Sequence, residues 1–143
     1  MQGNFTILIA DKNRNVRDYL RRELSPEGYQ VLTARDGEEV MRAIEGEDAL
    51  HLLILDLDIP GVTGLAILEK IQGRKPPLPV IIHTFLTEDA DHAIENAAGL
   101  FVEKSGNIEH LKSAIADMLK RFYPAGLPER SELPARPAGK EGS

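Results

Sequence analysis

Short apolar runs alternate with amphipathic stretches along the first 122 residues of the chain. The runs are rich in Ile, Leu and Val and lack internal polar alternation. Such runs are typical of strands that are buried on both faces of a parallel sheet. Five segments are therefore predicted as strands: 5–10, 29–33, 50–55, 79–83 and 100–103.

The stretches between these runs place apolar residues three or four positions apart, which is the spacing of one face of an α-helix. Asp36 and Asn107 are suitable N-caps for two of them. Five alternating strand and helix units predict an α/β fold, a doubly wound parallel sheet with helices on both faces. The apolar positions that mark the helices are Val16, Leu20 and Leu24; Val40 and Ile44; Leu65, Leu68 and Ile71; Ala90, Ala93, Ile94 and Ala97; and Ile108, Leu111, Ile115, Leu119 and Phe122.

Composition narrows the class of protein. The length of 143 residues suits one domain, and the absence of cysteine excludes disulfides, a thiol nucleophile and cysteine-ligated metal. The net charge is −6 and no stretch is strongly basic, which argues against direct nucleic-acid binding. No apolar run approaches the roughly 20 residues of a membrane span, and no signal peptide is evident. We therefore expect a cytoplasmic protein that does not bind membranes.

The segment 123–143 differs in composition from the rest. It holds four of the nine prolines and shows no apolar periodicity. Such a segment buries too little apolar surface to offset its chain entropy. We predict one domain over residues 1–122, followed by a disordered Pro/Gly-rich tail or linker over residues 123–143.

Polar residues stand where four of the predicted strands end. Asp11 and Lys12 follow the first strand, Asp56 the third, Thr84 the fourth and Lys104 the fifth. Each residue alone is equally consistent with an ordinary turn or surface position. In doubly wound sheets, however, ligand sites form beyond the carboxyl ends of the strands. The shared placement therefore predicts a chemical site at that edge, or its remnant.

These residues occur in an order that resembles the receiver domains of response regulators, over residues 5 to about 122. The loop after the third strand matches an Asp-x-x-x-Pro signature through Asp56 and Pro60. The resemblance implies strand order 2-1-3-4-5, a flavodoxin-like arrangement, and a signalling module rather than an enzyme in the usual sense. The segments that carry it are ILIAD at 7–11, LLILDLDIPGVTG at 52–64, VIIHT at 80–84 and AGLFVEK at 98–104.

The same resemblance assigns roles to individual residues. Asp56 would accept a phosphoryl group from a histidine kinase or phosphotransfer protein, since a carboxylate can form an acyl phosphate. Lys104 and Thr84 would contact the phosphoryl oxygens. Mg²⁺ would bind the carboxylates of Asp11 and Asp56 and the main-chain carbonyl of Asp58.

Phe101 matches the aromatic position whose rotation accompanies activation in that family. Together with Thr84 it would couple the site to the face formed by the fourth helix, fifth strand and fifth helix. The resemblance implies that this face binds a downstream protein or output domain, or forms a homodimer. On its residue type alone, Phe101 is a core or groove aromatic.

Three residues depart from the family pattern. Lys12 replaces a second metal-binding acid, and because a charged lysine offers no lone pair, Mg²⁺ binding is predicted to be weakened or lost. Phe85 replaces a small residue and would crowd the phosphoryl site. Ser105 replaces a proline that follows a cis bond; without proline a cis bond costs about 3 kcal/mol, so a different loop path is expected.

These departures keep other functions open. The chain could be a pseudo-receiver, a binding module that no longer uses phosphate. Asp56-x-Asp58 also resembles the acidic pair of haloacid dehalogenase phosphatases, but it follows the third strand rather than the first. A flavin binder would need a Ser/Thr/Gly-rich loop after the first strand. The histidines lack metal-ligand spacing, and His83 is expected to pack on the face opposite Thr84: His51, His83, His92 and His110.

Overall fold

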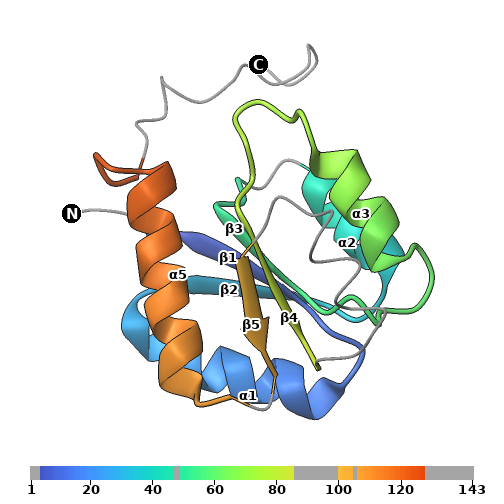
Figure 1. Ribbon diagram of the computed structural model, residues 1–143, viewed down its shortest axis with the longest axis horizontal. Coiled ribbons are helices and arrows are strands. Elements are labelled where there is room, and N and C mark those ends of the chain that lie inside the picture. The colour runs from blue at the N-terminus through green and yellow to red at the C-terminus, as the bar shows by residue number, and fades with distance from the viewer. Residues whose placement is uncertain (1–3, 47–48, 86–99, 105, 128–143) are drawn as a thin grey trace.

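The structure, a computed structural model, describes residues 4–46, 49–85, 100–104 and 106–127. One sheet of five parallel strands runs through the molecule, with helices on both sides (Figure 1). The strand order β2-β1-β3-β4-β5 confirms the α/β fold and the order inferred from the resemblance. The strands are β1 (Thr6–Ala10), β2 (Gln30–Ala34), β3 (Leu52–Leu55), β4 (Val80–Thr84) and β5 (Leu100–Glu103).

Four of the five predicted helices lie among the described residues. The helix predicted at 90–97 lies outside them. No helix in the described part of the chain is long and apolar enough to cross a lipid bilayer. The helices are α1 (Arg14–Leu24), followed by a 3₁₀ turn (Ser25–Glu27), then α2 (Gly37–Glu45), α3 (Gly64–Ile71) and α5 (Ile108–Phe122).

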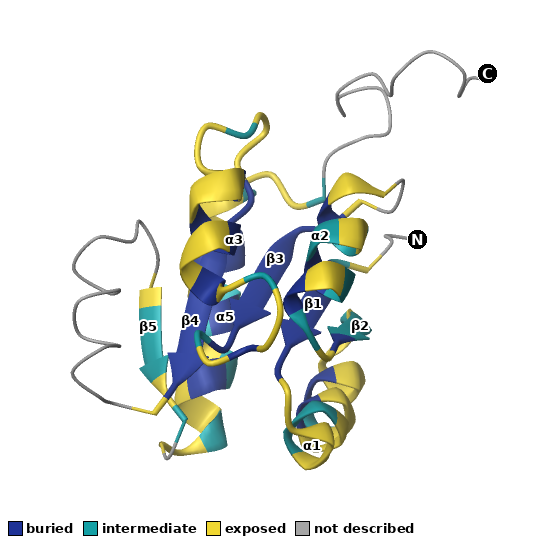
Figure 2. Cartoon of the chain, turned by 90° about the vertical axis from the view of Figure 1, so that its right-hand side faces the viewer, coloured by how far each residue is buried: buried dark blue, intermediate teal, exposed yellow. Residues whose placement is uncertain are grey.

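The sheet separates two hydrophobic cores, because successive side chains of a strand point to opposite faces. Ile7 and Ile9 of β1 pack with the buried residues of α1 and α5. Leu8 and Ala10 pack on the other face with those of α2 and α3. Figure 2 shows the buried central strands β1, β3 and β4 between helices whose outer faces are exposed. This double coverage explains why the central strands are mostly apolar.

Side-chain caps fix the starts of the helices. The Asp36 carboxylate accepts the Glu39 N–H at 2.9 Å, and the Asn107 side chain accepts the Glu109 N–H at 2.8 Å, as predicted. Asn13 caps α1 in the same way, although sequence reasoning had not singled it out. Each such cap contributes about 1 kcal/mol to helix stability.

Two residues expected in the core are exposed. Leu65 on α3 is 51% exposed and Phe122 at the end of α5 is 37% exposed. Each helical residue advances about 100° around the axis. The face of α3 that meets the sheet is centred on Ile67 and Ile71, and Leu65 points well away from it. The spacing of three between apolar residues had suggested a different face.

The two ends of the described chain meet beside β1. The rings of Phe5 and Tyr123 lie 5.4 Å apart between centroids, and His51 lies 5.3 Å from Phe5 and 5.4 Å from Tyr123. The Thr6 N–H donates to His51 Nδ1 at 2.8 Å. Helix α5 ends at Phe122, as predicted, and Tyr123 packs on the domain. The predicted tail from residue 128 onward lies outside the described residues.

Candidate functional site

Two aspartates are buried at the carboxyl ends of neighbouring central strands. Asp11 follows β1 and Asp56 follows β3, and they are 2% and 3% exposed. The ladder hydrogen bonds continue past both strand ends, from Asp11 N–H to Ala34 O at 3.0 Å and from Asp56 N–H to Ala10 O at 2.9 Å. The backbone therefore holds both carboxylates rigidly at one edge of the sheet.

Lys104 joins the two carboxylates. Its Nζ lies 2.7 Å from Asp11 Oδ2 and 2.7 Å from Asp56 Oδ2, and its side chain is only 8% exposed. Burial alone would lower the pKa of the ammonium, but the hydrogen bonds to Asp11 and Asp56 outweigh burial and raise it. One cation thus compensates two buried negative charges.

The second oxygen of Asp56 accepts two further hydrogen bonds. The Asp58 N–H donates to Asp56 Oδ1 at 3.0 Å, and Thr84 Oγ1 donates to the same oxygen at 3.0 Å. Thr84 ends β4, the neighbour of β3, and is 6% exposed. The structure thus brings together Asp11, Asp56, Thr84 and Lys104, four of the residues singled out from strand ends.

Lys12, the fifth of those residues, lies at the mouth of the site. Its ammonium forms an ion pair with the Asp58 carboxylate. Both side chains are open to solvent, 52% exposed for Lys12 and 81% for Asp58. The hydrogen bond to Asp58 raises the pKa of the Lys12 ammonium, and the Asp58 charge adds to this effect.

The oxygen donors at this edge offer a reduced ligand set for Mg²⁺. Among the described residues, no group of three or more Asp, Glu or His side chains is arranged to hold a metal ion. Mg²⁺ keeps several waters and needs only one or two carboxylates, so Asp11, Asp56 and the Asp58 carbonyl fit it chemically. The Lys12 ammonium opposes a second cation at the same mouth by charge repulsion.

Phe85 covers part of the site from the next position after Thr84. Its ring is 57% exposed, and Lys104 Nζ lies 5.5 Å from the ring centroid, within the range of a cation–π contact. Ser105 lies outside the described residues, yet Lys104 reaches both carboxylates. Phe101 on β5 is half-buried and packs against the core on the α2 and α3 side.

His83 precedes Thr84 on β4 and points to the other face of the sheet. It is 7% exposed, which confirms the expectation of a packed histidine. Burial lowers the pKa of its imidazole, and the charge of Lys104 lowers it further. His83 therefore lines the reverse side of the site as a packed side chain.

Several contacts that position the site could not be inferred from the sequence. The Asn13 N–H donates to Asp11 Oδ1 at 2.8 Å, and Arg17 Nη1 donates to the Asp11 carbonyl at 2.8 Å. The Gly37 N–H at the start of α2 donates to Pro60 O at 2.8 Å. The loop that carries Asp58 is therefore fastened to α2. The only signal for this loop in the sequence was the turn pair Pro60-Gly61.

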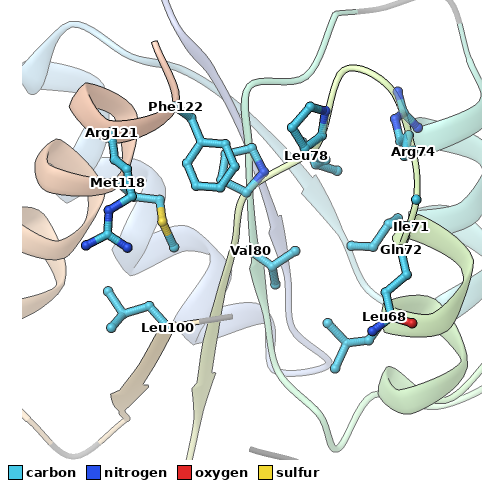
Figure 3. A pocket seen from close by; sticks show the side chains of 13 residues that line it. Leu68, Ile71, Gln72, Arg74, Leu78, Val80, Leu100, Met118, Arg121 and Phe122 are labelled. Carbon is cyan, nitrogen blue, oxygen red and sulfur yellow. The ribbon is translucent and has the colours of Figure 1, made fainter. Parts of the chain in front are cut away.

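A cavity of about 520 Å³ lies at the amino ends of β4 and β5, opposite the end of the sheet that carries the site. Its walls come from the end of α3, the following loop, the first residues of β4 and β5, and the end of α5 (Figure 3). Val80 and Leu100, which begin their strands, lie in its lining. The cavity is therefore separate from Asp56, which follows the carboxyl end of β3.

A doubly wound sheet with this arrangement of two aspartates, a threonine and a lysine at its carboxyl edge defines a receiver-type switch domain. A family model described as the response regulator receiver domain matches residues 7–116. The chain belongs to this family. Its members are signalling modules of two-component systems, in which phosphorylation on aspartate and Mg²⁺ binding are standard.

Relatives of known sequence support this assignment. The response regulator MprA of Mycobacterium tuberculosis is 33% identical over 124 residues, which cover 82% of this chain and 52% of MprA. The response regulator RR06 of Streptococcus pneumoniae is 30% identical over 119 residues, covering 82% of this chain and 54% of RR06. The chain thus spans about half the length of these curated relatives.

Solved structures show the same fold. The response regulator TrrA of Thermotoga maritima, solved in complex with Mg²⁺ and BeF, is 32% identical with a TM-score of 0.69, over 80% of this chain and 98% of that chain. A CheY-like receiver domain protein of Methanospirillum hungatei is 26% identical with a TM-score of 0.76, over 87% of this chain and 100% of that chain. These matches agree with the family assignment and favour neither a phosphatase nor a flavin binder.

Proposed function

We propose that this chain accepts a phosphoryl group on Asp56 from a histidine kinase or phosphotransfer protein. The observation that carries the proposal is the environment of the Asp56 carboxylate. It is held by Thr84 on one oxygen and by Lys104 on the other, at the carboxyl edge of the sheet. Their direct contact with the Asp56 carboxylate supports a role for Lys104 and Thr84 in binding the incoming phosphoryl oxygens.

Phosphoryl transfer depends mainly on positioning and on stabilising negative charge. An Asp56 oxygen forms a bond to the phosphorus of the donor's phosphohistidine while the phosphorus–nitrogen bond breaks and its electron pair leaves with the imidazole. The resulting acyl phosphate keeps its charge near the Lys104 ammonium. Mg²⁺, when bound by Asp11, Asp56 and the Asp58 carbonyl, supplies further charge neutralisation. Because Lys12 stands at the mouth of the site, we expect the affinity of this chain for Mg²⁺ to be lower than that of a receiver with an acidic residue at the same position.

The output is a change in a protein-interaction face. Thr84 would follow the phosphoryl group, and Phe101 on the adjacent strand would move with it, as the family resemblance implies. A pre-existing equilibrium between two conformations would be shifted by phosphorylation. The partner would be a downstream protein, an output domain or a second copy of the chain that contacts β5 and α5.

The proposal is tested by mass spectrometry. The chain is incubated with Mg²⁺ and acetyl phosphate, and intact mass is measured alongside the variant Asp56→Asn. One added phosphoryl group on the native chain that is absent from the variant supports the proposal. No adduct on the native chain, under conditions that label an ordinary receiver, contradicts it.

A pseudo-receiver is the second candidate, and the ion pair between Lys12 and Asp58 favours it. Lys12 removes a metal ligand and adds a positive charge at the mouth. The variant Lys12→Asp separates the two functions. If only this variant is labelled, the native chain is a binding module whose substituted metal ligand prevents phosphorylation.

A further inference from the structure

Lys12 places a second ammonium at the mouth of the acidic site, and its position there is loosely held. Its partner Asp58 is 81% exposed, and Lys12 itself is 52% exposed. Exposed ion pairs of this kind contribute little to stability, because water solvates both partners well. The Lys12 ammonium is therefore free to exchange Asp58 for a stronger anionic partner.

Phosphorylation would create such a partner beside it. The Asp58 N–H donates to Asp56 Oδ1, so the residue that holds Lys12 is also in contact with the acceptor carboxylate. A phosphoryl group on Asp56 brings close to two negative charges and three strong acceptor oxygens. Lys104 is already shared by two carboxylates at 2.7 Å each. The added charge calls for a second cation, and Lys12 is placed to supply it.

We propose that Lys12 is a phosphoryl-binding residue: it leaves Asp58 for a phosphoryl oxygen when Asp56 is phosphorylated, and it sustains phosphoryl acceptance in the absence of a divalent cation. This inference rests on the proposed phosphorylation of Asp56. In this proposal Lys12, which stands where the family has an acidic residue, takes part in the reaction. Charge-assisted hydrogen bonds to phosphate are stronger than an exposed ion pair, so the exchange is favourable.

The step balances without a metal ion. An Asp56 oxygen forms a bond to the phosphorus of acetyl phosphate while the bond from phosphorus to the acetyl oxygen breaks. The electron pair of that bond leaves with acetate, and no proton is transferred. Lys12 and Lys104 remain protonated throughout and stabilise the charge on the phosphoryl oxygens.

The test uses the full chain in excess EDTA with acetyl phosphate, and follows the added phosphoryl mass over time. The variant Lys12→Gln keeps a polar side chain of similar length without the charge. We expect it to be labelled at least about tenfold more slowly than the native chain, since removing one charge-stabilising donor costs about that much or more. Lys12→Arg should retain most of the rate.

The outcomes separate this inference from the proposed function. Equal labelling of the native chain and Lys12→Gln in EDTA overturns the role of Lys12. Labelling of the native chain that requires Mg²⁺ also overturns it, while phosphorylation of Asp56 stands. If the native chain is not labelled even with Mg²⁺, the proposed function itself fails, whatever the result for Lys12→Asp. Circular dichroism of each variant checks that the fold is kept.

Discussion

At the scale of single residues, the site is organised around a shared cation. Lys104 contacts Asp11 and Asp56 at equal distances, so loss of either carboxylate leaves the lysine one remaining partner. Loss of the lysine leaves two buried carboxylates without compensation, which is the costlier change. Loss of Lys104 should therefore lower the stability of the domain more than loss of either Asp11 or Asp56.

The buried side chain of His51 makes the stability of the domain depend on pH. Burial lowers the pKa of His51, whose Nδ1 accepts the Thr6 N–H. An unfolded histidine has a pKa of about 6.5, so below that pH the unfolded chain binds the proton more readily. Stability is therefore full above about pH 6.5 and falls as the pH drops toward the lower folded pKa.

The variant His51→Asn tests this dependence, because it keeps an acceptor near the Nδ1 position but does not titrate. We expect its free energy of unfolding in urea to fall less between pH 7.5 and 5.5 than that of the native chain. His83 titrates in the same direction in both proteins and so cancels in the comparison. An identical fall in both proteins would exclude His51 as a source.

The residues of the site could be predicted from the sequence where their position depended only on the strand ends. Asp11, Asp56, Thr84 and Lys104 meet because parallel strands bring their carboxyl ends to one edge. Which of the nearby acids pairs with Lys12 could not be predicted, since the conformation of an exposed lysine depends on what lies opposite. Here that is Asp58, 46 positions away in the chain.

At the scale of elements, the loop after Asp56 is fastened to α2 at a glycine. Gly61 has φ of +83°, and a Cβ atom there would lie 2.1 Å from Glu38 Oε1 on α2. Gly28 has a similar φ of +98° but open space around it. The two positions share the backbone requirement for glycine and differ only in the contact with α2.

This pair gives a matched test of the contact. Gly28→Ala should destabilise the chain by about 1–2 kcal/mol through backbone strain alone. Gly61→Ala should cost at most about 0.5 kcal/mol more, because the end of the exposed Glu38 side chain can move away from the added methyl group. Urea unfolding measures both variants. A much larger loss at Gly61, removed by adding Glu38→Ala, would mean that the Glu38 side chain is held in place against the loop.

The positions of the helices and strands could be predicted from the sequence better than the side of each helix that is buried. Apolar runs located the strands, and Asp36 and Asn107 marked two helix starts. The buried face of α3 was misassigned because Leu65 continued a spacing of three, whereas Ile67 and Ile71 are four residues apart. A helix of eight residues has too few apolar positions to fix its buried face from spacing alone.

At the scale of the whole molecule, Tyr123 joins the end of α5 to the beginning of the chain. Its hydroxyl donates to the His51 carbonyl at 3.4 Å, and its ring packs against Phe5 and His51. Composition placed Tyr123 in a tail, because nothing in the sequence shows that α5 ends beside β1. Only the three-dimensional arrangement supplies that contact.

The contribution of Tyr123 can be measured by two substitutions. Tyr123→Ala should lower the free energy of unfolding by about 2 kcal/mol, less than for a fully buried aromatic side chain. Tyr123→Phe keeps the ring and loses only a long hydrogen bond, so its effect should stay within about 0.5 kcal/mol. A small loss for Tyr123→Ala would show that the domain ends at Phe122 in energetic terms, despite the contacts that Tyr123 makes.

The meeting of Phe5 and Tyr123 has a mechanical consequence. A chain that enters at one and leaves at the other returns to its starting point, with ring centroids 5.4 Å apart. The domain would thus add almost no length to a polymer that contained it. A pulling force on its two ends would load the contact between β1 and α5 first. Asp56 lies beyond the opposite edge of the sheet, outside that line of tension.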